Sequence, residues 1–296
     1  MTASRARFGR VLTAMVTPFR DDGSLDLDEA QRLARHLIAN GSEGLVVAGS
    51  TGEAATLTDE EQVSLFRAVK DAVGTDASVV AGTGTNWTEH SVALTREAEK
   101  AGADAALVVT PYYNRPPQDA LLDHFRTVAD ASNLPILLYD VPIRTATKID
   151  VETLLQAAQH PNIVGLKDAS DDIATSTLLA AQLPEGFEIY SGDDSMTLAY
   201  QAIGAVGVIS VVAHVMGDLI AEQFTAFESG DLARAREIQF LERRLNTALL
   251  TSNPVSIKAA VKMIGFNVGD PRPPLRPATA DEKQRIKAAL QELGVL

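Results

Sequence analysis

A lysine and a tyrosine at the ends of two consecutive apolar segments are the residues of this sequence best suited to chemistry. Lys167 directly follows the apolar segment 162–166, and Tyr139 lies near the end of the segment 135–140. Burial disfavours the charged form of a lysine, so Lys167 in an apolar setting can act as an amine nucleophile. A neighbouring tyrosine can move protons to and from an imine. Taken singly, the alternatives are a lysine that reaches solvent from a strand end and a tyrosine packed at a rim.

Further hydroxyls and one guanidinium follow other apolar segments. Ser50, Thr51 and Tyr113 supply hydroxyl groups for a proton relay. Ser50 and Thr51 stand between two glycines, a pattern that is also typical of a turn. Arg144 can bind a carboxylate through two parallel hydrogen bonds, or it can form a surface ion pair with a nearby aspartate.

The elements that would position these residues are eight short, β-branched apolar segments, nearly all followed by a helical pattern. Segments that are apolar on both faces are typical of parallel strands covered on both sides. Their number and alternation predict an α/β fold, a (β/α)8 TIM barrel, with its active site at the C-terminal ends of the strands. The alternative is an open doubly wound sheet, but no G-x-G-x-x-G opens a helix after the first strand, and GTG at 82–84 is only a fragment of that motif. The predicted strands are 11–16, 44–49, 77–82, 105–110, 135–140, 162–167, 187–192 and 206–212.

Only helical patterns follow the last predicted strand. We therefore predict a barrel over 1–225 and a C-terminal helical extension over 226–296 that packs on the barrel. The predicted helices of this part are 214–229, 231–250, 254–264 and 279–294, with the Pro-rich stretch 270–277 separating the last two.

Composition excludes several classes of function. The 296 residues carry a net charge of −13, which argues against nucleic acid as a partner. The chain has no cysteine, and its five histidines are widely spaced, so we expect no metal site. No segment has 18 uninterrupted apolar residues, and the first residues lack the pattern of a leader, so we expect no membrane span and a cytoplasmic location.

Together these residues resemble the dihydrodipicolinate synthase/N-acetylneuraminate lyase family of class I aldolases, over nearly the whole chain. A single motif would be weak, but seven occur in the order typical of the family. They are GSTGE (49–53), VTPYYNRPPQ (109–118), LLYDVPIRT (137–145), GLKDAS (165–170), YSGDD (190–194), GVISV (207–211) and NPVSIK (253–258).

The resemblance implies a catalytic role for some of these residues. Lys167 would form a Schiff base with pyruvate, and Tyr139 would be the acid/base residue. Thr51 would hold the pyruvate carboxylate, and Tyr113 would enter the site from a neighbouring subunit to complete the relay with Ser50. No metal or organic cofactor is implied, because the imine itself serves as the electron sink.

The resemblance also implies substrate-binding positions. Gly192 and the backbone carbonyl of Ile209 would lie beside the pyruvate adduct, and Arg144 would hold the carboxylate of L-aspartate 4-semialdehyde. The implied reaction is the condensation of these two substrates to 4-hydroxy-tetrahydrodipicolinate, in lysine and diaminopimelate biosynthesis. The implied assembly is a homo-oligomer, a tetramer built as a dimer of dimers.

Ser50 departs from the pattern, because synthases of this family usually have two threonines here. A retro-aldolase that acts on a 2-keto-3-deoxy sugar acid, sialic acid or hydroxy-oxoglutarate is therefore the alternative. A non-catalytic regulatory barrel is a third possibility, which the presence of both Lys167 and Tyr139 disfavours. Feedback-inhibited relatives bind lysine near the positions of Tyr112 and Asn86, and commonly have a glutamate where His90 stands. An imidazole in place of that carboxylate removes an acceptor, which Asp59 replaces only in part, so we expect weak inhibition by lysine or none.

Overall fold

The computed structural model describes residues 6–249 and 253–296. Eight parallel strands close into a barrel in which each strand pairs with its neighbours in the sequence and β1 pairs with β8. The strands are β1 (Val11–Ala14), β2 (Gly44–Val47), β3 (Ser78–Gly82), β4 (Ala105–Val109), β5 (Ile136–Asp140), β6 (Ile163–Asp168), β7 (Glu188–Ser191) and β8 (Gly207–Ser210). The predicted barrel is confirmed.

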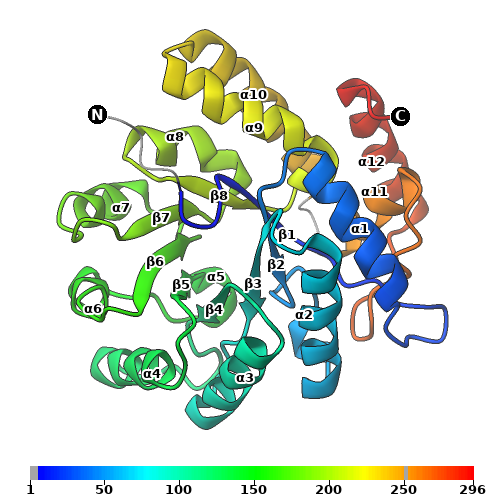
Figure 1. Cartoon of the computed structure of the whole chain (residues 1–296). Coiled ribbons are helices and arrows are strands. Elements are labelled where there is room, and N and C mark those ends of the chain that lie inside the picture. The colour runs from blue at the N-terminus through cyan, green and yellow to red at the C-terminus, as the bar shows by residue number, and fades with distance from the viewer. Residues whose placement is uncertain (1–5, 250–252) are drawn as a thin grey trace.

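Helices surround the barrel, and the last four gather on the side of β8, β1 and β2 (Figure 1). Around the barrel lie α1 (Leu27–Ala39), α2 (Asp59–Val73), α3 (Thr88–Lys100), α4 (Gln118–Asp130), α5 (Pro142–Thr145), α6 (Val151–Ala157), α7 (Ile173–Ala180) and α8 (Thr197–Ala202), with the 3-10 turns η1 (Ala54–Thr56) and η2 (Asp194–Met196). The last four are α9 (Ala213–Ser229), α10 (Leu232–Leu249), α11 (Val255–Met263) and α12 (Ala280–Leu293).

Side chains alternate between the inside of the barrel and the layer beneath the helices. On β5, Leu138 belongs to the outer apolar cluster and Tyr139 to the inner one. On β6, Leu166 likewise lies in the outer cluster. Because successive strand residues point to opposite faces, Lys167 faces the barrel interior with Tyr139. Each functional side chain is therefore aimed by the parity of its strand position.

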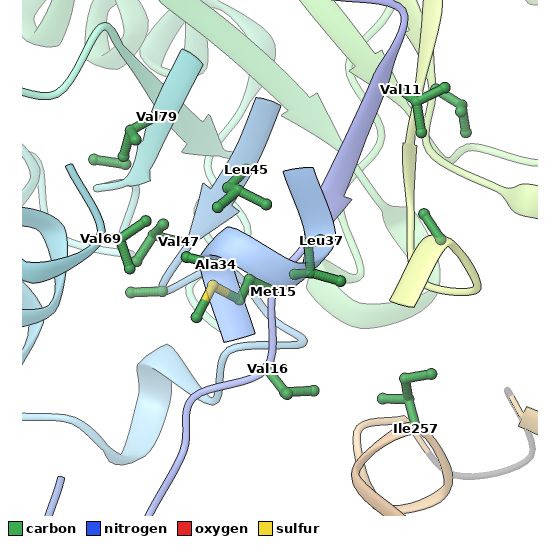
Figure 2. Close-up of a cluster of buried hydrophobic side chains, with 14 of the residues drawn as sticks. Val11, Met15, Val16, Ala34, Leu37, Leu45, Val47, Val69, Val79 and Ile257 are labelled. Atoms are coloured by element: carbon green, nitrogen blue, oxygen red, sulfur yellow. The ribbon is translucent and has the colours of Figure 1, made fainter. Parts of the chain in front are cut away.

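The outer cluster also includes residues of the helical extension. Ile257 of α11 is buried in the same cluster as Val16, Leu37 and Leu45 (Figure 2). The helix α9 runs from residue 213 to 229 and so continues through the predicted boundary at 225. The division of the chain into two units stays a prediction. Among the helices of the described residues, none is both long and apolar enough to cross a membrane.

Candidate active site

Lys167 and Tyr139 face each other at the C-terminal end of the barrel. They are register partners on β6 and β5, and each is only 6% exposed. The Lys167 Nζ lies 4.3 Å from the centroid of the Tyr139 ring. A buried amine beside a phenol is the combination that imine chemistry requires, because the amine supplies the nucleophile and the phenol a proton carrier.

A cavity of about 520 Å³ opens over the ends of β2 to β5, and we call it the mouth cavity. Three predicted site residues, Ser50, Tyr139 and Arg144, contribute to its wall. Asn253, from the helical extension, lines the same wall. The cavity has the size expected for a small-molecule site. Tyr139 lines the cavity wall and also contacts Lys167.

The loop after β2 presents Ser50 and Thr51 differently. Ser50 is exposed at the cavity, whereas Thr51 is 4% exposed and its Oγ1 accepts a hydrogen bond from Asn253 Nδ2 at 3.0 Å. The turn is tight, since a Cβ on Gly52 would lie 3.0 Å from the Cα of Ala48. A side chain at position 52 would therefore crowd the backbone of Ala48, and glycine lets the loop close without this contact.

Arg144 lies on α5, a single helical turn that the sequence patterns did not reveal. Pro142 at the first position of this turn favours the helix start, and Ala146 ends it in a left-handed conformation with φ 58°. Arg144 is exposed, and no ion pair involves its guanidinium among the residues that the structure describes. The surface ion pair considered from the sequence is not formed, which leaves this cation available to an anionic ligand.

Tyr113 lies apart from the other predicted site residues. Its side chain is 90% exposed, and its backbone adopts a left-handed conformation with φ 74°. The next residue helps to hold the loop, because Asn114 Nδ2 donates to the carbonyl of Asn86 at 2.7 Å. Within one chain Tyr113 does not line the mouth cavity, and its role stays a prediction.

Gly192 directly follows β7, and Ile209 is the penultimate residue of β8. The Gly192 N–H donates to the carbonyl of Asp168 at 2.6 Å, and a Cβ at position 192 would lie 2.9 Å from that oxygen. Close approach of β7 to the residue after Lys167 therefore needs glycine. Ile209 is 1% exposed and belongs to the inner cluster together with Tyr139.

Two carboxyl groups next to the lysine–tyrosine pair were not singled out from the sequence as site residues. Asp140 and Asp168 are register partners one position beyond Tyr139 and Lys167, and they point away from the barrel interior. Burial, with a smaller contribution from the Asp168 carboxylate, raises the pKa of Asp140 to about 7, although the hydrogen bond from Ile149 acts in the opposite direction. The Asp140 carboxylate accepts the Ile149 N–H at 3.3 Å, and Asp168 accepts the Ser170 N–H at 2.9 Å.

Both ring nitrogens of His214 are occupied by hydrogen bonds within the fold. His214 Nδ1 faces the carbonyl of Val211 at 2.7 Å, and its Nε2 accepts the Val16 N–H at 3.1 Å, an arrangement that requires the neutral ring. Burial lowers the pKa of His214 to about 4. Within 6–249 and 253–296, no three histidine, aspartate or glutamate side chains are grouped as metal ligands.

Comparison with known proteins identifies relatives over the full length of the chain. A model of the dihydrodipicolinate synthetase family matches residues 7–293. The 4-hydroxy-tetrahydrodipicolinate synthase of Moorella thermoacetica is 51% identical over 291 residues, which cover 98% of this chain and 100% of the relative.

Solved structures of dihydrodipicolinate synthases share the fold of this chain. The dihydrodipicolinate synthase of Cyanidioschyzon merolae with lysine bound has a TM-score of 0.96 and 42% identity, covering 98% of this chain and 99% of that one. A protein described as the first monomeric dihydrodipicolinate synthase variant has a TM-score of 0.95 and 36% identity, covering 98% of each chain.

Proposed function

The chain belongs to the dihydrodipicolinate synthetase family, and from this premise we propose that it is a lyase that condenses pyruvate with L-aspartate 4-semialdehyde. The product is 4-hydroxy-tetrahydrodipicolinate, and the enzyme is 4-hydroxy-tetrahydrodipicolinate synthase in its activity. The observation that carries the proposal is the buried Lys167, with its Nζ 4.3 Å from the centroid of the Tyr139 ring beside the mouth cavity.

In the first half of the reaction, the Lys167 amine attacks the ketone carbon of pyruvate and water leaves, which forms a protonated imine. The imine draws electrons from the adjacent methyl group, which loses a proton and becomes the nucleophilic carbon of an enamine. Tyr139 carries the protons of these steps, and Ser50 and Tyr113 connect its hydroxyl to solvent. Thr51 holds the pyruvate carboxylate, and Gly192 and Ile209 frame the adduct.

In the second half, the enamine carbon bonds to the aldehyde carbon of aspartate semialdehyde, and the aldehyde oxygen takes a proton to become a hydroxyl. The amino group of this substrate then attacks the imine carbon, which closes the ring and releases the Lys167 amine. Arg144 orients the second substrate, since its exposed guanidinium is the cation on the cavity wall without an ion-pair partner in the described part of the chain. Two parallel hydrogen bonds to a carboxylate would fix its direction as well as its charge.

Two measurements test the proposal. Borohydride added with pyruvate should inactivate the enzyme and leave one reduced pyruvate on Lys167, which peptide mass spectrometry locates. An adduct elsewhere, or none, would overturn the Schiff-base mechanism. A coupled assay should show turnover of pyruvate with aspartate semialdehyde, and faster cleavage of a 2-keto-3-deoxy sugar acid would instead support the retro-aldolase alternative that Ser50 leaves open.

We also propose a homotetramer assembled as a dimer of dimers. Exposed apolar side chains support two contact regions, with Tyr113 and Ile143 at the barrel mouth and Leu178 and Phe240 on α7 and α10. Covering the first region would bring Tyr113 of one subunit to the cavity of another. Because a relative with this fold is monomeric, sedimentation must decide: the wild type should be a tetramer and Phe240→Lys a dimer, whereas an active wild-type monomer would contradict the proposal.

A further inference from the structure

The loop that carries Ser50 and Thr51 is held in place by the helical extension. Asn253 Nδ2 donates to Thr51 Oγ1 at 3.0 Å, just before α11 begins. Within α11, Lys258 Nζ pairs with Glu53 Oε1 at 2.7 Å. Asn253 and Lys258 thus bind the side chains at the two ends of the segment 51–53, and we call these two residues the extension clamp.

The charged half of the extension clamp lies in the protein interior. The side chains of Lys258 and Glu53 are 1% and 2% exposed, and the second Glu53 oxygen accepts the Arg272 N–H at 2.9 Å. Burial lowers the pKa of Lys258, and the Glu53 carboxylate acts in the opposite direction. A buried ion pair contributes little net stability, but moving either partner leaves a bare buried charge. The pair therefore fixes where the loop can lie.

The neutral half of the extension clamp, Asn253, sets the direction in which the Thr51 hydroxyl can donate its hydrogen bond. A threonine hydroxyl has one hydrogen and accepts through its lone pairs. Because the Asn253 amide already donates to Thr51 Oγ1, the Thr51 hydrogen is left to point elsewhere, and an anion beside the loop is a suitable acceptor. The Asn253 Oδ1 is buried and has no hydrogen-bond partner in the part of the chain that the structure describes. The Asn253 side chain thus gives its one described hydrogen bond to the Thr51 hydroxyl.

We propose that the extension clamp is part of the pyruvate site, with Asn253 and Lys258 as positioning residues that act through Thr51 and Glu53. This inference rests on the proposed function, because it assigns the Thr51 hydroxyl to the pyruvate carboxylate. The helical extension then does more than cover the barrel, since Ile257, between the two clamp residues, anchors α11 in the outer apolar cluster. The separation of Glu53 and Lys258 by 205 residues makes this a connection that only the fold creates.

A double-mutant cycle tests the neutral half of the clamp. Asn253→Leu should raise the KM for pyruvate about tenfold, because a misplaced Thr51 hydroxyl loses its hydrogen bond to the charged carboxylate, with little change in kcat or in the KM for the aldehyde. Thr51→Val should have a similar effect. The double variant should match Thr51→Val alone, because Asn253 acts through that hydroxyl. Asn267→Leu, at an exposed asparagine of the same extension, is the control and should leave all three constants unchanged.

A second pair of variants tests the charged half without leaving a bare charge. Glu53→Gln combined with Lys258→Gln keeps two polar groups in contact, so the chain should fold, and thermal unfolding checks this. The KM for pyruvate should rise several-fold while the KM for the aldehyde stays constant. The control is Arg244→Gln combined with Glu292→Gln, an exposed pair between α10 and α12 with side chains 64% and 55% exposed.

The pyruvate concentration that half-saturates borohydride inactivation measures imine formation alone and separates the possible results. A wild type that forms no adduct overturns the proposed function, and the inference with it. A wild type that forms the adduct, with unchanged half-saturation in Asn253→Leu, overturns the inference and leaves the proposed function standing. Additive losses in the double-mutant cycle would also overturn it, since they would show that Asn253 does not act through Thr51.

Discussion

Two contacts between the helical extension and the barrel place fully buried charged groups together in the described part of the chain, and they differ in sign. At α11, the cation Lys258 faces the carboxylate Glu53. At α10, Glu242 is fully buried near Asp194, a second buried carboxyl at the end of β7. Burial and the Asp194 charge raise the pKa of Glu242, and burial raises that of Asp194 to about 6.

The contact at α11 has no net charge when its carboxylate is ionised, whereas the contact at α10 is negatively charged unless one of its carboxyl groups holds a proton. Opposite charges at α11 compensate each other throughout the neutral pH range. At α10, two carboxylates close together in the interior are stable only while a proton is bound. Asp194 nevertheless holds the end of β8, because one of its oxygens accepts the N–H groups of Val211 at 3.0 Å and Val212 at 3.2 Å. The stability of the α11 contact should therefore be independent of pH in the neutral range, whereas the stability of the α10 contact should depend on pH.

The largest expected effect comes from removing one charge at α11. Lys258→Met leaves Glu53 buried without its counter-ion, and the free energy of unfolding should fall by about 3–5 kcal/mol. Urea denaturation measures this loss. Adding Glu53→Gln to Lys258→Met should restore much of the stability, because no bare charge remains. If the double variant is as unstable as the single one, packing of the lysine stem, and not charge, dominates this contact.

Arg144 shows what a cation does when it lacks such a partner. It is exposed on the mouth cavity, so Arg144→Ala should change the free energy of unfolding by less than about 0.5 kcal/mol. The KM for aspartate semialdehyde should rise about 10- to 100-fold, as expected for losing hydrogen bonds between charged groups. Half-saturation of borohydride inactivation by pyruvate should stay constant. Equal damage to both substrates would mean that Arg144 has a structural role.

The barrel strands and the pair of residues that they carry could be predicted from the sequence, but a short helix could not. The strands were predicted within two residues of their observed ends, because buried β-branched segments carry a local signal. Their parity and order brought Lys167 and Tyr139 together as expected. The helix α5, only four residues long, gave no periodic pattern, and Pro142 was its one local signal.

The extension clamp was missed for a different reason. GSTGE and NPVSIK were both recognised as motifs, but nothing in their patterns pairs Glu53 with Lys258 across 205 residues. The usable signal was a lysine inside the apolar run of α11, since a charge in such a position usually has a buried partner. The same reasoning applies to Glu242, which lies on the buried side of α10.

The α10 contact should make stability depend on pH. A carboxyl whose pKa is raised by folding contributes stability that is fully present below its unfolded pKa, near 4, and is lost as pH rises through its folded value. That folded value is about 6 for Asp194 at the α10 contact, and Asp140, at the end of β5 and outside this contact, adds to the effect with a value of about 7. The free energy of unfolding should therefore fall between pH 5 and pH 8.

Glu242→Gln isolates this effect. The variant should match the wild type at pH 5 and be more stable at pH 8 by about 1 kcal/mol or more, because the amide needs no proton. Denaturant unfolding at the two pH values measures the difference. Glu237→Gln, at a 70% exposed side chain of the same helix, should show no such dependence. A Glu242→Gln variant that loses stability at both pH values would mean that its hydrogen bonds outweigh its charge.

The smallest expected effect concerns an exposed pair at the mouth cavity. His90 Nε2 lies 2.8 Å from Asp59 Oδ1, with side chains 30% and 56% exposed, and Tyr112 lines the same wall. The family resemblance locates a lysine effector near these residues, and an effector with two ammonium groups needs free acceptors. Asp59 already faces an imidazole, which would repel an ammonium when protonated. We therefore expect weak or no inhibition by lysine in the coupled assay, and His90→Glu should strengthen it by supplying a carboxylate acceptor. Half-inhibition of the wild type at submillimolar lysine would show that the Asp59–His90 pair opens readily, and that exposed pairs at this cavity constrain ligands far less than the buried pair at α11 constrains the loop.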